Sequence, residues 1–86
     1  ASLRRMRRSA DLAFAASVAR SRLEALAAAR CDALASGTDE ARGVVSTWTV
    51  EPTSLPTVRA VSQTVVYSLD GRTRTDTYRT MIFCPE

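Results

Sequence analysis

The 86-residue chain contains no histidine, and neither lysine nor asparagine occurs anywhere in it. Without histidine, a conventional Ser-His or Cys-His catalytic pair cannot be built, so we expect no catalytic residues and no enzymatic activity. All 12 basic residues are therefore arginines, and with nine carboxylates they give a net charge of +3. So small an excess does not by itself indicate a nucleic-acid partner. We also predict no cofactor and no small-molecule substrate.

Long hydrophobic runs are absent as well. The longest uncharged apolar stretch covers residues 12–19, well short of the roughly 20 residues that cross a bilayer, and no signal peptide with an apolar core is visible. The two cysteines lack the histidine partners of common zinc sites, and the Asp39-Glu40 pair is attributed to a solvated turn. No metal site is predicted. At this length the chain predicts one domain, residues 1–86, around a single small core.

The first part of the chain predicts one long helix over residues 2–35. It consists largely of Ala, Leu, Arg and Ser, without Gly or Pro, and most of these residues favour helix. Gly37 is the expected stop. The predicted core-facing stripe comprises Leu12, Ala16, Ala19, Leu23, Leu26, Ala27 and Leu34. A helix of this length spans about 50 Å, so we expect its first third to project beyond a compact domain.

The second part predicts a three-stranded antiparallel sheet over residues 43–84, after a loop at 36–42. Residues 43–51 form a strand candidate that ends at Pro52, and residues 58–69 and 72–84 flank Asp70-Gly71, the strongest short hairpin signal. This turn pairs Leu69 with Arg72. The predicted core face holds Val61, Val65, Tyr67, Leu69, Tyr78, Ile82 and Cys84. The expected fold class is therefore α+β, with one long helix on a small sheet.

The two cysteines are predicted to form a disulfide. Cys31 lies near the end of the predicted helix beside its core stripe, and Cys84 lies on the core face of the last strand. Closing this loop contributes about 4 kcal/mol in the chain-entropy model. The alternative is two buried free thiols. A disulfide implies an oxidising compartment outside the cytoplasm.

The side of the helix opposite the predicted core stripe is also apolar, with small residues at spacings of three and four. Such a row allows another helix to approach closely. We therefore predict a helix-packing interface, and the alternative is an Ala-rich helix that is simply exposed. The interface comprises Leu3, Ala10, Phe14, Ser17, Val18, Ser21, Ala25 and Ala28.

A basic segment precedes the predicted core stripe and comprises Arg4, Arg5, Arg7 and Arg8. These side chains surround the helix instead of forming one face. Contact with anionic membrane headgroups is one expectation for them. Nucleic-acid binding is disfavoured, because no aromatic platform and no recognised nucleic-acid module accompanies the arginines.

The stretch "AFAASVARSRLEALAAARCDALASG", followed by Trp48-Thr49-Val50 and a terminal strand, resembles the type IV pilin and pseudopilin superfamily. It is most similar to minor pseudopilins of the I type and to pilin-modification proteins. Residues 13–50 and 72–84 carry the similarity. The family's cleavage-site glycine, early Phe and Glu, and apolar membrane helix have no counterpart in these residues. The resemblance therefore implies a pilin-like domain that lacks its N-terminal membrane segment.

This resemblance implies a non-enzymatic structural subunit of a bacterial type IV pilus or type II secretion filament. Its partners would be other pilin or pseudopilin subunits, bound through the N-terminal helix. The full-length protein would be periplasmic or extracellular, anchored to the inner membrane or the filament. The alternative function is a small secreted Arg-rich module that binds nucleic acid or an anionic surface.

Overall fold

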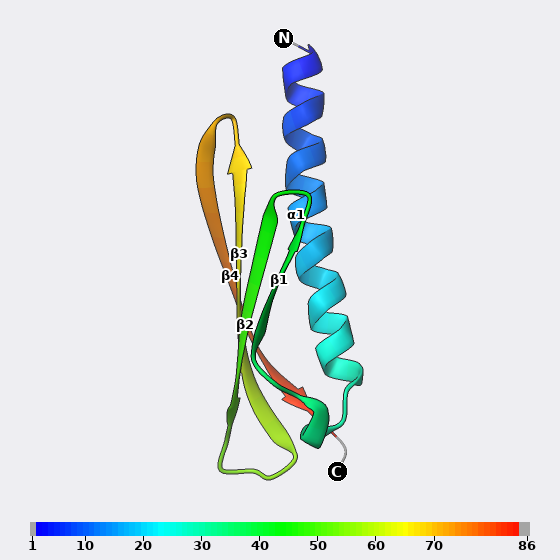
Figure 1. Ribbon diagram of the computed structural model, residues 1–86. Helices are drawn as coiled ribbons and strands as arrows, with labels where there is room; N and C mark the ends of the chain where they lie inside the picture. The colour runs from blue at the N-terminus through cyan, green and yellow to red at the C-terminus, as the bar shows by residue number, and fades with distance from the viewer. Residues whose placement is uncertain (1, 85–86) are drawn as a thin grey trace.

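The computed structural model describes residues 2–84, with side chains from Met6 onward. One helix packs on one face of a four-stranded antiparallel sheet with strand order β1-β2-β3-β4 (Figure 1). The elements are α1 (Ser2–Ala28), a 3-10 turn η1 (Cys31–Ala33), β1 (Gly37–Ala41), β2 (Val44–Pro52), β3 (Val58–Leu69) and β4 (Arg72–Phe83). The predicted α+β class is confirmed. The sheet has four strands where three were predicted.

The additional strand, β1, lies within the predicted 36–42 loop. It pairs with β2 from Gly37↔Trp48 to Ala41↔Val44, around a tight turn in which Arg42 and Gly43 have φ values of 50° and 81°. Positive φ at both central residues matches the twist of a two-residue hairpin. The sequence of β1, Gly-Thr-Asp-Glu-Ala, has one β-branched residue, Thr38, and no aromatic residue, so its composition did not predict a strand.

The hairpin of β3 and β4 has the predicted register. Leu69 pairs with Arg72 and Tyr67 with Arg74, and the pairing continues without a bulge to Val58↔Phe83. Asp70 and Gly71 have φ values of 54° and 75°, as a type I′ turn requires. The predicted core-face residues of this hairpin are buried, except Tyr78, which is half-buried. The predicted alternation of core and solvent faces is therefore confirmed.

The helix ends earlier than predicted, at Ala28 instead of residue 35. Arg30 is extended, with φ −74° and ψ 157°, and η1 follows directly. Neither Gly nor Pro marks this break, so local helix propensity is overridden by tertiary structure. Two tertiary contacts account for it: Cys31 reaches the end of the last strand, and Leu34 packs against the hydrophobic cluster that contains Leu26 and Trp48.

The core consists of two hydrophobic clusters beneath α1. The upper cluster joins Ala15 and Ala19 to Val65, Tyr67 and Leu69, together with Val44. The lower cluster comprises Leu26, Trp48, Val61, Ile82 and Cys84. The buried line of α1 runs through Ala15, Ala19 and Leu26. The predicted stripe was correct in part: Ala19 and Leu26 are buried, and Leu23 and Leu34 are half-buried. Its other members, Leu12, Ala16 and Ala27, are exposed.

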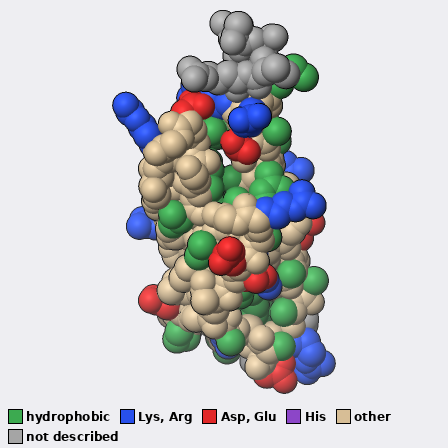
Figure 2. Space-filling view, turned by 45° about the horizontal axis from the view of Figure 1, so that its top comes forward, with side chains coloured by type: hydrophobic (Ala, Val, Ile, Leu, Met, Phe, Trp, Pro, Cys, Tyr) green, Lys and Arg blue, Asp and Glu red, His purple; other side chains and the backbone are tan. Residues whose placement is uncertain are grey.

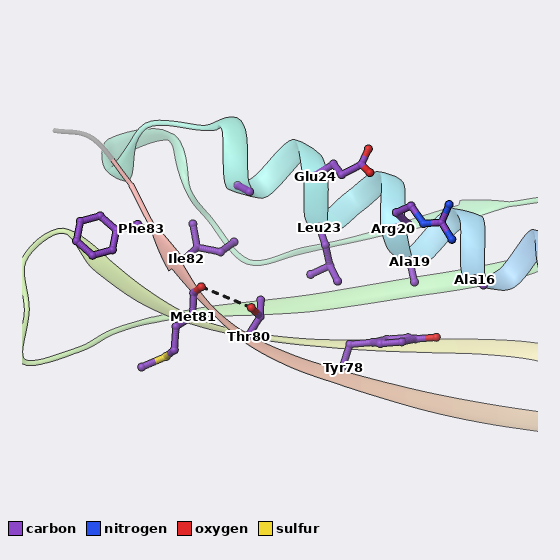
Figure 3. A pocket seen from close by; sticks show the side chains of 11 residues that line it. Ala16, Ala19, Arg20, Leu23, Glu24, Tyr78, Thr80, Met81, Ile82 and Phe83 are labelled. Atoms are coloured by element: carbon purple, nitrogen blue, oxygen red, sulfur yellow. Dashed lines mark hydrogen bonds between the residues drawn. The ribbon is translucent and has the colours of Figure 1, made fainter.

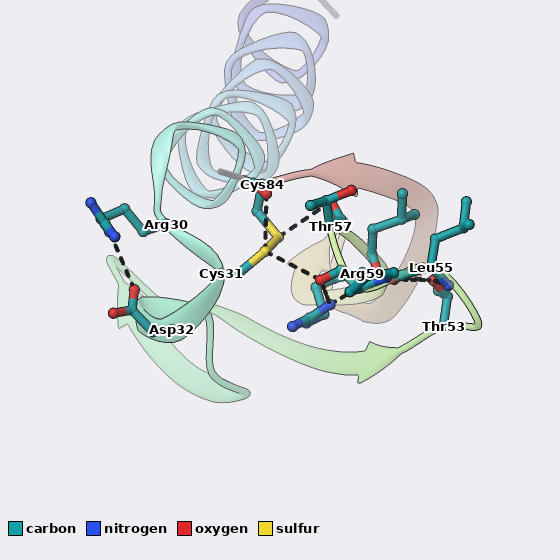
Figure 4. The surroundings of a disulfide bond; sticks show 10 residues. Arg30, Cys31, Asp32, Thr53, Leu55, Thr57, Arg59 and Cys84 are labelled. Carbon is teal, nitrogen blue, oxygen red and sulfur yellow. Dashed lines mark hydrogen bonds and ion pairs between the residues drawn. A yellow bond between two sulfur atoms is a disulfide. The ribbon is translucent and has the colours of Figure 1, made fainter. Parts of the chain in front are cut away.

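Cys31 and Cys84 form the predicted disulfide, with their Cα atoms 5.0 Å apart across 53 positions of sequence (Figure 4). This separation is ordinary for a disulfide. The bond joins η1 to the end of β4, next to the loop between β2 and β3, where the Cys84 amide donates to the Thr57 carbonyl at 2.9 Å. The end of the helix, the last strand and this loop are therefore tied together at one pole.

The helix is 27 residues long, or about 40 Å, and the molecule measures 52 × 18 × 17 Å. Its N-terminal turns project past the β3–β4 hairpin (Figure 1). Because Arg8 reaches the hairpin turn at Asp70, at 3.6 Å, the projection is about two turns, shorter than the predicted third of the helix. No helix in the described part of the chain has the length and apolar character of a bilayer span.

Candidate functional site

The exposed side of α1 is the candidate interaction surface, and it consists mainly of small side chains. Between Met6 and Ala28, the exposed residues are mostly Ala, Ser and Leu, interspersed with three arginines and two carboxylates. Small exposed residues let a neighbouring helix come close to the backbone. The exposed small residues are Ser9, Ala10, Ala13, Ala16, Ser17, Ser21, Ala25, Ala27 and Ala28.

The predicted helix-packing interface is partly incorporated into the domain. Phe14 and Val18 are half-buried and pack against the upper core cluster, and the guanidinium of Arg42 lies 5.4 Å from the centre of the Phe14 ring. The expectation that both side chains face away from the sheet was wrong. The physical reason is β1: this strand widens the sheet beneath that side of the helix.

Five of the eight predicted interface residues line a groove between α1 and the β1–β2 hairpin. They are Phe14, Ser17, Val18, Ser21 and Ala25. Ala10 and Ala28 are exposed, and Leu3 lies outside the described side chains. The structure therefore places the predicted interface along one flank of the helix, between its outward side and β1, and leaves Ser17, Ser21 and Ala25 accessible.

A second groove runs along the other flank of α1, against β4 (Figure 3). Ala16, Leu23 and Ala27 line its helix side, and Tyr78, Thr80 and Ile82 line its strand side. The Leu23 side chain points toward the sheet, whereas Glu24 and Arg20 point outward (Figure 3). Apolar side chains thus continue from the core into this groove. Both flanks of the helix are open in the described structure.

A cluster around Arg22 joins the helix to the first two strands, and the sequence did not predict it. The guanidinium of Arg22 lies 4.1 Å from the centre of the Trp48 ring and donates to Asp39 Oδ2 at 2.8 Å. Trp48 Nε1 donates to the Ala35 carbonyl at 3.0 Å, and the ring covers Gly37. One sequence feature pointed to this cluster: Arg22 follows Ala15 by seven residues and therefore lies on the same face of the helix.

A polar layer separates the two core clusters. Gln63 is 0% and Ser46 2% exposed, and Gln63 Nε2 donates to Ser46 Oγ at 2.9 Å. Gln63 Oε1 has no hydrogen-bond partner among the described residues. Buried polar groups cost free energy unless they are paired, so this layer contributes less to stability than apolar residues of the same shape would.

One titratable pair lies at the upper end of the sheet. Tyr67 is 4% exposed, and its hydroxyl donates to Asp76 Oδ2 at 2.7 Å. This hydrogen bond, followed by burial, raises the pKa of Tyr67 above its usual value of 10.0. Both effects stabilise the neutral phenol. This hydrogen bond joins β3 to β4.

The basic segment is only partly visible. Arg4 and Arg5 lie outside the described side chains, while Arg7 and Arg8 are exposed. Arg8 is paired with Asp70. Figure 2 shows arginine and acidic side chains dispersed over this face of the molecule, with hydrophobic atoms exposed between them. The described charges do not form a continuous basic patch.

The sheet face opposite the helix is uncovered within residues 2–84. A row of threonines crosses all four strands, since Thr38 pairs with Thr47, Thr47 with Thr64, and Thr64 with Thr77. Met81 and Phe83, on the same face, are 64% and 79% exposed. Large exposed apolar side chains of this kind mark interaction surfaces when they gather.

The described residues contain no group of three or more Cys, Asp or Glu side chains placed to hold a metal ion. Comparison with known proteins identifies no relative: no family model, no curated protein and no solved structure matches this chain. The surfaces described above can contact a partner through side-chain packing and through backbone hydrogen bonds.

Proposed function

We propose that this protein is a minor pilin or pseudopilin subunit, a structural component of a type IV pilus or type II secretion filament that assembles through α1. In this proposal it performs no catalysis, and its ligands are neighbouring subunits of similar build. It works outside the cytoplasm, anchored through its full-length form to the inner membrane or to the filament. The family in this proposal rests on the resemblance carried by residues 13–50 and 72–84.

The observation that carries the proposal is the exposed side of α1. A single helix covers one sheet face, projects beyond it, and keeps small uncharged side chains over most of its solvent side. A helix that only closes its own domain is normally charged there. Ala13 is the central example, because it is exposed and only two positions from buried Ala15.

The disulfide supports the same proposal. It fixes the last strand to the end of the helix, and disulfides of this kind persist in oxidising compartments. The pole that carries it lies opposite the projecting end of α1 (Figure 1). Assembly through the N-terminal half of the helix therefore leaves the disulfide-bonded pole and the sheet free to face outward.

Ala13→Arg tests this function. The substitution adds a long charged side chain to an exposed helix position, so the melting temperature should change little. Co-purification of sister pilin-like subunits with the full-length protein should fall by about tenfold or more, since a charge buried without a partner weakens an interface strongly. Thr49→Arg, on the exposed helix-free face of β2, adds the same charge and serves as the control.

Two results would count against a filament role. If Ala13→Arg and Thr49→Arg co-purify equal amounts of partner subunits, α1 is not the assembly surface. If the protein instead retains DNA in a salt-dependent manner through Arg7 and Arg8, the Arg-rich binding module is favoured.

A further inference from the structure

The free edge of the sheet at β4 is long and regular. β4 has 12 residues, against five in the opposite edge strand β1, and no other described segment lies outside it (Figure 1). It contains no proline, and its pairing with β3 is free of bulges. Prolines, bulges, short strands and charged side chains are the usual devices that keep an edge from pairing with another chain. Of these, β4 has only the charged side chains, so its row of backbone donors and acceptors is open to a strand whose charges match.

The charges along β4 are self-complementary in one antiparallel register. In a two-fold pairing centred on Thr75, Arg74 of each copy faces Asp76 of the partner subunit, and the arrangement occurs twice. Arg74 and Asp76 lie on the helix side of the sheet, because they pair with Tyr67 and Val65. Opposite charges that face each other across strands stabilise a pair, whereas like charges destabilise it.

Each neighbouring register brings two like charges together at its centre. A pairing centred on Arg74 places the two Arg74 side chains face to face, although Arg72 then faces Asp76 of the partner subunit. A pairing centred on Asp76 places the two carboxylates face to face. In the Thr75-centred register, Arg72 faces the partner's Tyr78, where a cation can lie over an aromatic ring. Arg72 and Arg74 have no ion pair among the described residues. The charges therefore select one register.

We propose that the β4 edge binds a second copy of this chain, antiparallel and centred on Thr75, to give a continuous eight-stranded sheet. The two-fold axis lies perpendicular to the sheet, so both helices occupy the same face. Because α1 packs mainly over β2 and β3, the two helices are separated by the paired β4 strands and do not collide. The exposed side of α1 takes no part in this contact, so the inference is independent of the proposed filament role.

Single cysteines in β4 test both the pairing and its register. Thr73, Thr75 and Thr77 are all exposed on the helix-free face, so each tolerates a cysteine, and the native cysteines are already bonded to each other. At the two-fold axis, Thr75→Cys places two thiols directly opposite, with Cβ atoms about 5 Å apart. Thr73→Cys and Thr77→Cys are matched controls. In this register position 73 of one copy faces position 77 of the partner subunit, so neither variant alone places two cysteines opposite each other.

The purified chain is oxidised mildly, and dimers are counted by intact mass and non-reducing electrophoresis. We expect Thr75→Cys to cross-link at least about tenfold faster than either control alone. A mixture of the Thr73→Cys and Thr77→Cys chains should cross-link to each other. Arg74→Asp in the Thr75→Cys chain should slow cross-linking about tenfold, since both charge pairs become repulsive.

Three results would overturn the inference. Equal cross-linking rates for the three cysteine variants would exclude the register, and an unchanged rate with Arg74→Asp would exclude the charge selection. Sedimentation of the unmodified chain as a monomer at up to about 1 mM, the range of very weak complexes, would exclude the dimer. These experiments contain only the purified chain and no partner subunit, so failure of the β4 dimer would not contradict the proposed filament role.

Discussion

Arg22 lies over the indole of Trp48, with its guanidinium carbon 4.1 Å from the ring centre, and binds Asp39 at 2.8 Å with the same group. Through this one side chain the helix contacts both strands of the first hairpin. The arginine stem can cover apolar surface while its charged end remains near water. The contact explains why an arginine occupies a helix face that otherwise carries alanine and leucine.

Arg22→Ala should lower the free energy of unfolding by about 1 kcal/mol. The cation–π contact accounts for most of this, because the partly exposed ion pair contributes little. The free energy of unfolding of Arg22→Lys should lie between those of the unmodified chain and of Arg22→Ala, since lysine keeps the charge but loses the planar stacking. Chemical denaturation measures the change. Arg20→Ala, at an exposed position of the same helix, is the control, and an equal loss in that variant would show that the Trp48 contact is unimportant.

Gly37→Ala should destabilise the domain by about 1–3 kcal/mol through overpacking. A Cβ atom at position 37 would lie 2.8 Å from Cζ2 of Trp48, and the ring is held in place by its bond to the Ala35 carbonyl.

A double-mutant cycle with Trp48→Leu isolates this clash. The cost of Gly37→Ala should largely disappear once the indole is gone, giving a coupling free energy of about 1 kcal/mol or more. Independent, additive costs would mean that the glycine is required for another reason.

Stability should decrease at high pH because of Tyr67. Its pKa is raised in the folded protein, so above pH 10 the unfolded chain loses this proton while the folded chain retains it. Folding is then opposed as the pH rises through the folded pKa. Tyrosine absorbance and denaturation between pH 8 and 12 measure the effect. The titration is simple, because the chain has no lysine or histidine and only two tyrosines.

Tyr67→Phe should remove this pH dependence and cost about 1–3 kcal/mol at neutral pH, since Asp76 loses a partly buried hydrogen bond. Tyr78→Phe, on the half-buried position of β4, is the matched control. A decrease in stability at high pH that persists unchanged in Tyr67→Phe would contradict the assignment.

Reduction of the Cys31–Cys84 bond should lower stability by about 4 kcal/mol, through the entropy of a loop that spans 53 positions. Such a loss is comparable with the whole stability of many small domains. Mass spectrometry of the non-reduced protein should find no thiol that can be alkylated. Cys84→Ser should melt at the same temperature as the reduced native chain, and a melt unaffected by reduction would show that the bond does not hold the fold.

The hairpin was predictable because its signals are local. Asp70-Gly71 specifies a two-residue turn, and the alternation around Val65 and Tyr67 allows only one register. Once that register was known, Cys84 fell on the core face and the disulfide followed.

The orientation of the helix was not predictable in the same way. Alanine occurs on every side of α1, so the apolar pattern defines no sharp direction, and the burial of Phe14 depends on β1, a strand of polar residues. The end of the helix at Ala28 depends on the distant Cys84. Features determined by contacts between remote segments require the folded structure, and the Arg22 cluster belongs to this class.

Photo-cross-linking from Ala13 in the full-length protein, produced in its native cell, tests the filament assignment most directly. A photoreactive amino acid replaces Ala13, on the exposed side of α1, and in a parallel strain Thr49, on the opposite face of the sheet. Mass spectrometry identifies the adducts. In a filament subunit, the Ala13 position should capture the N-terminal helix of another pilin-like subunit, and the Thr49 position should not. Adducts only with nucleic acid or lipid, or equal capture from both positions, would contradict the filament assignment.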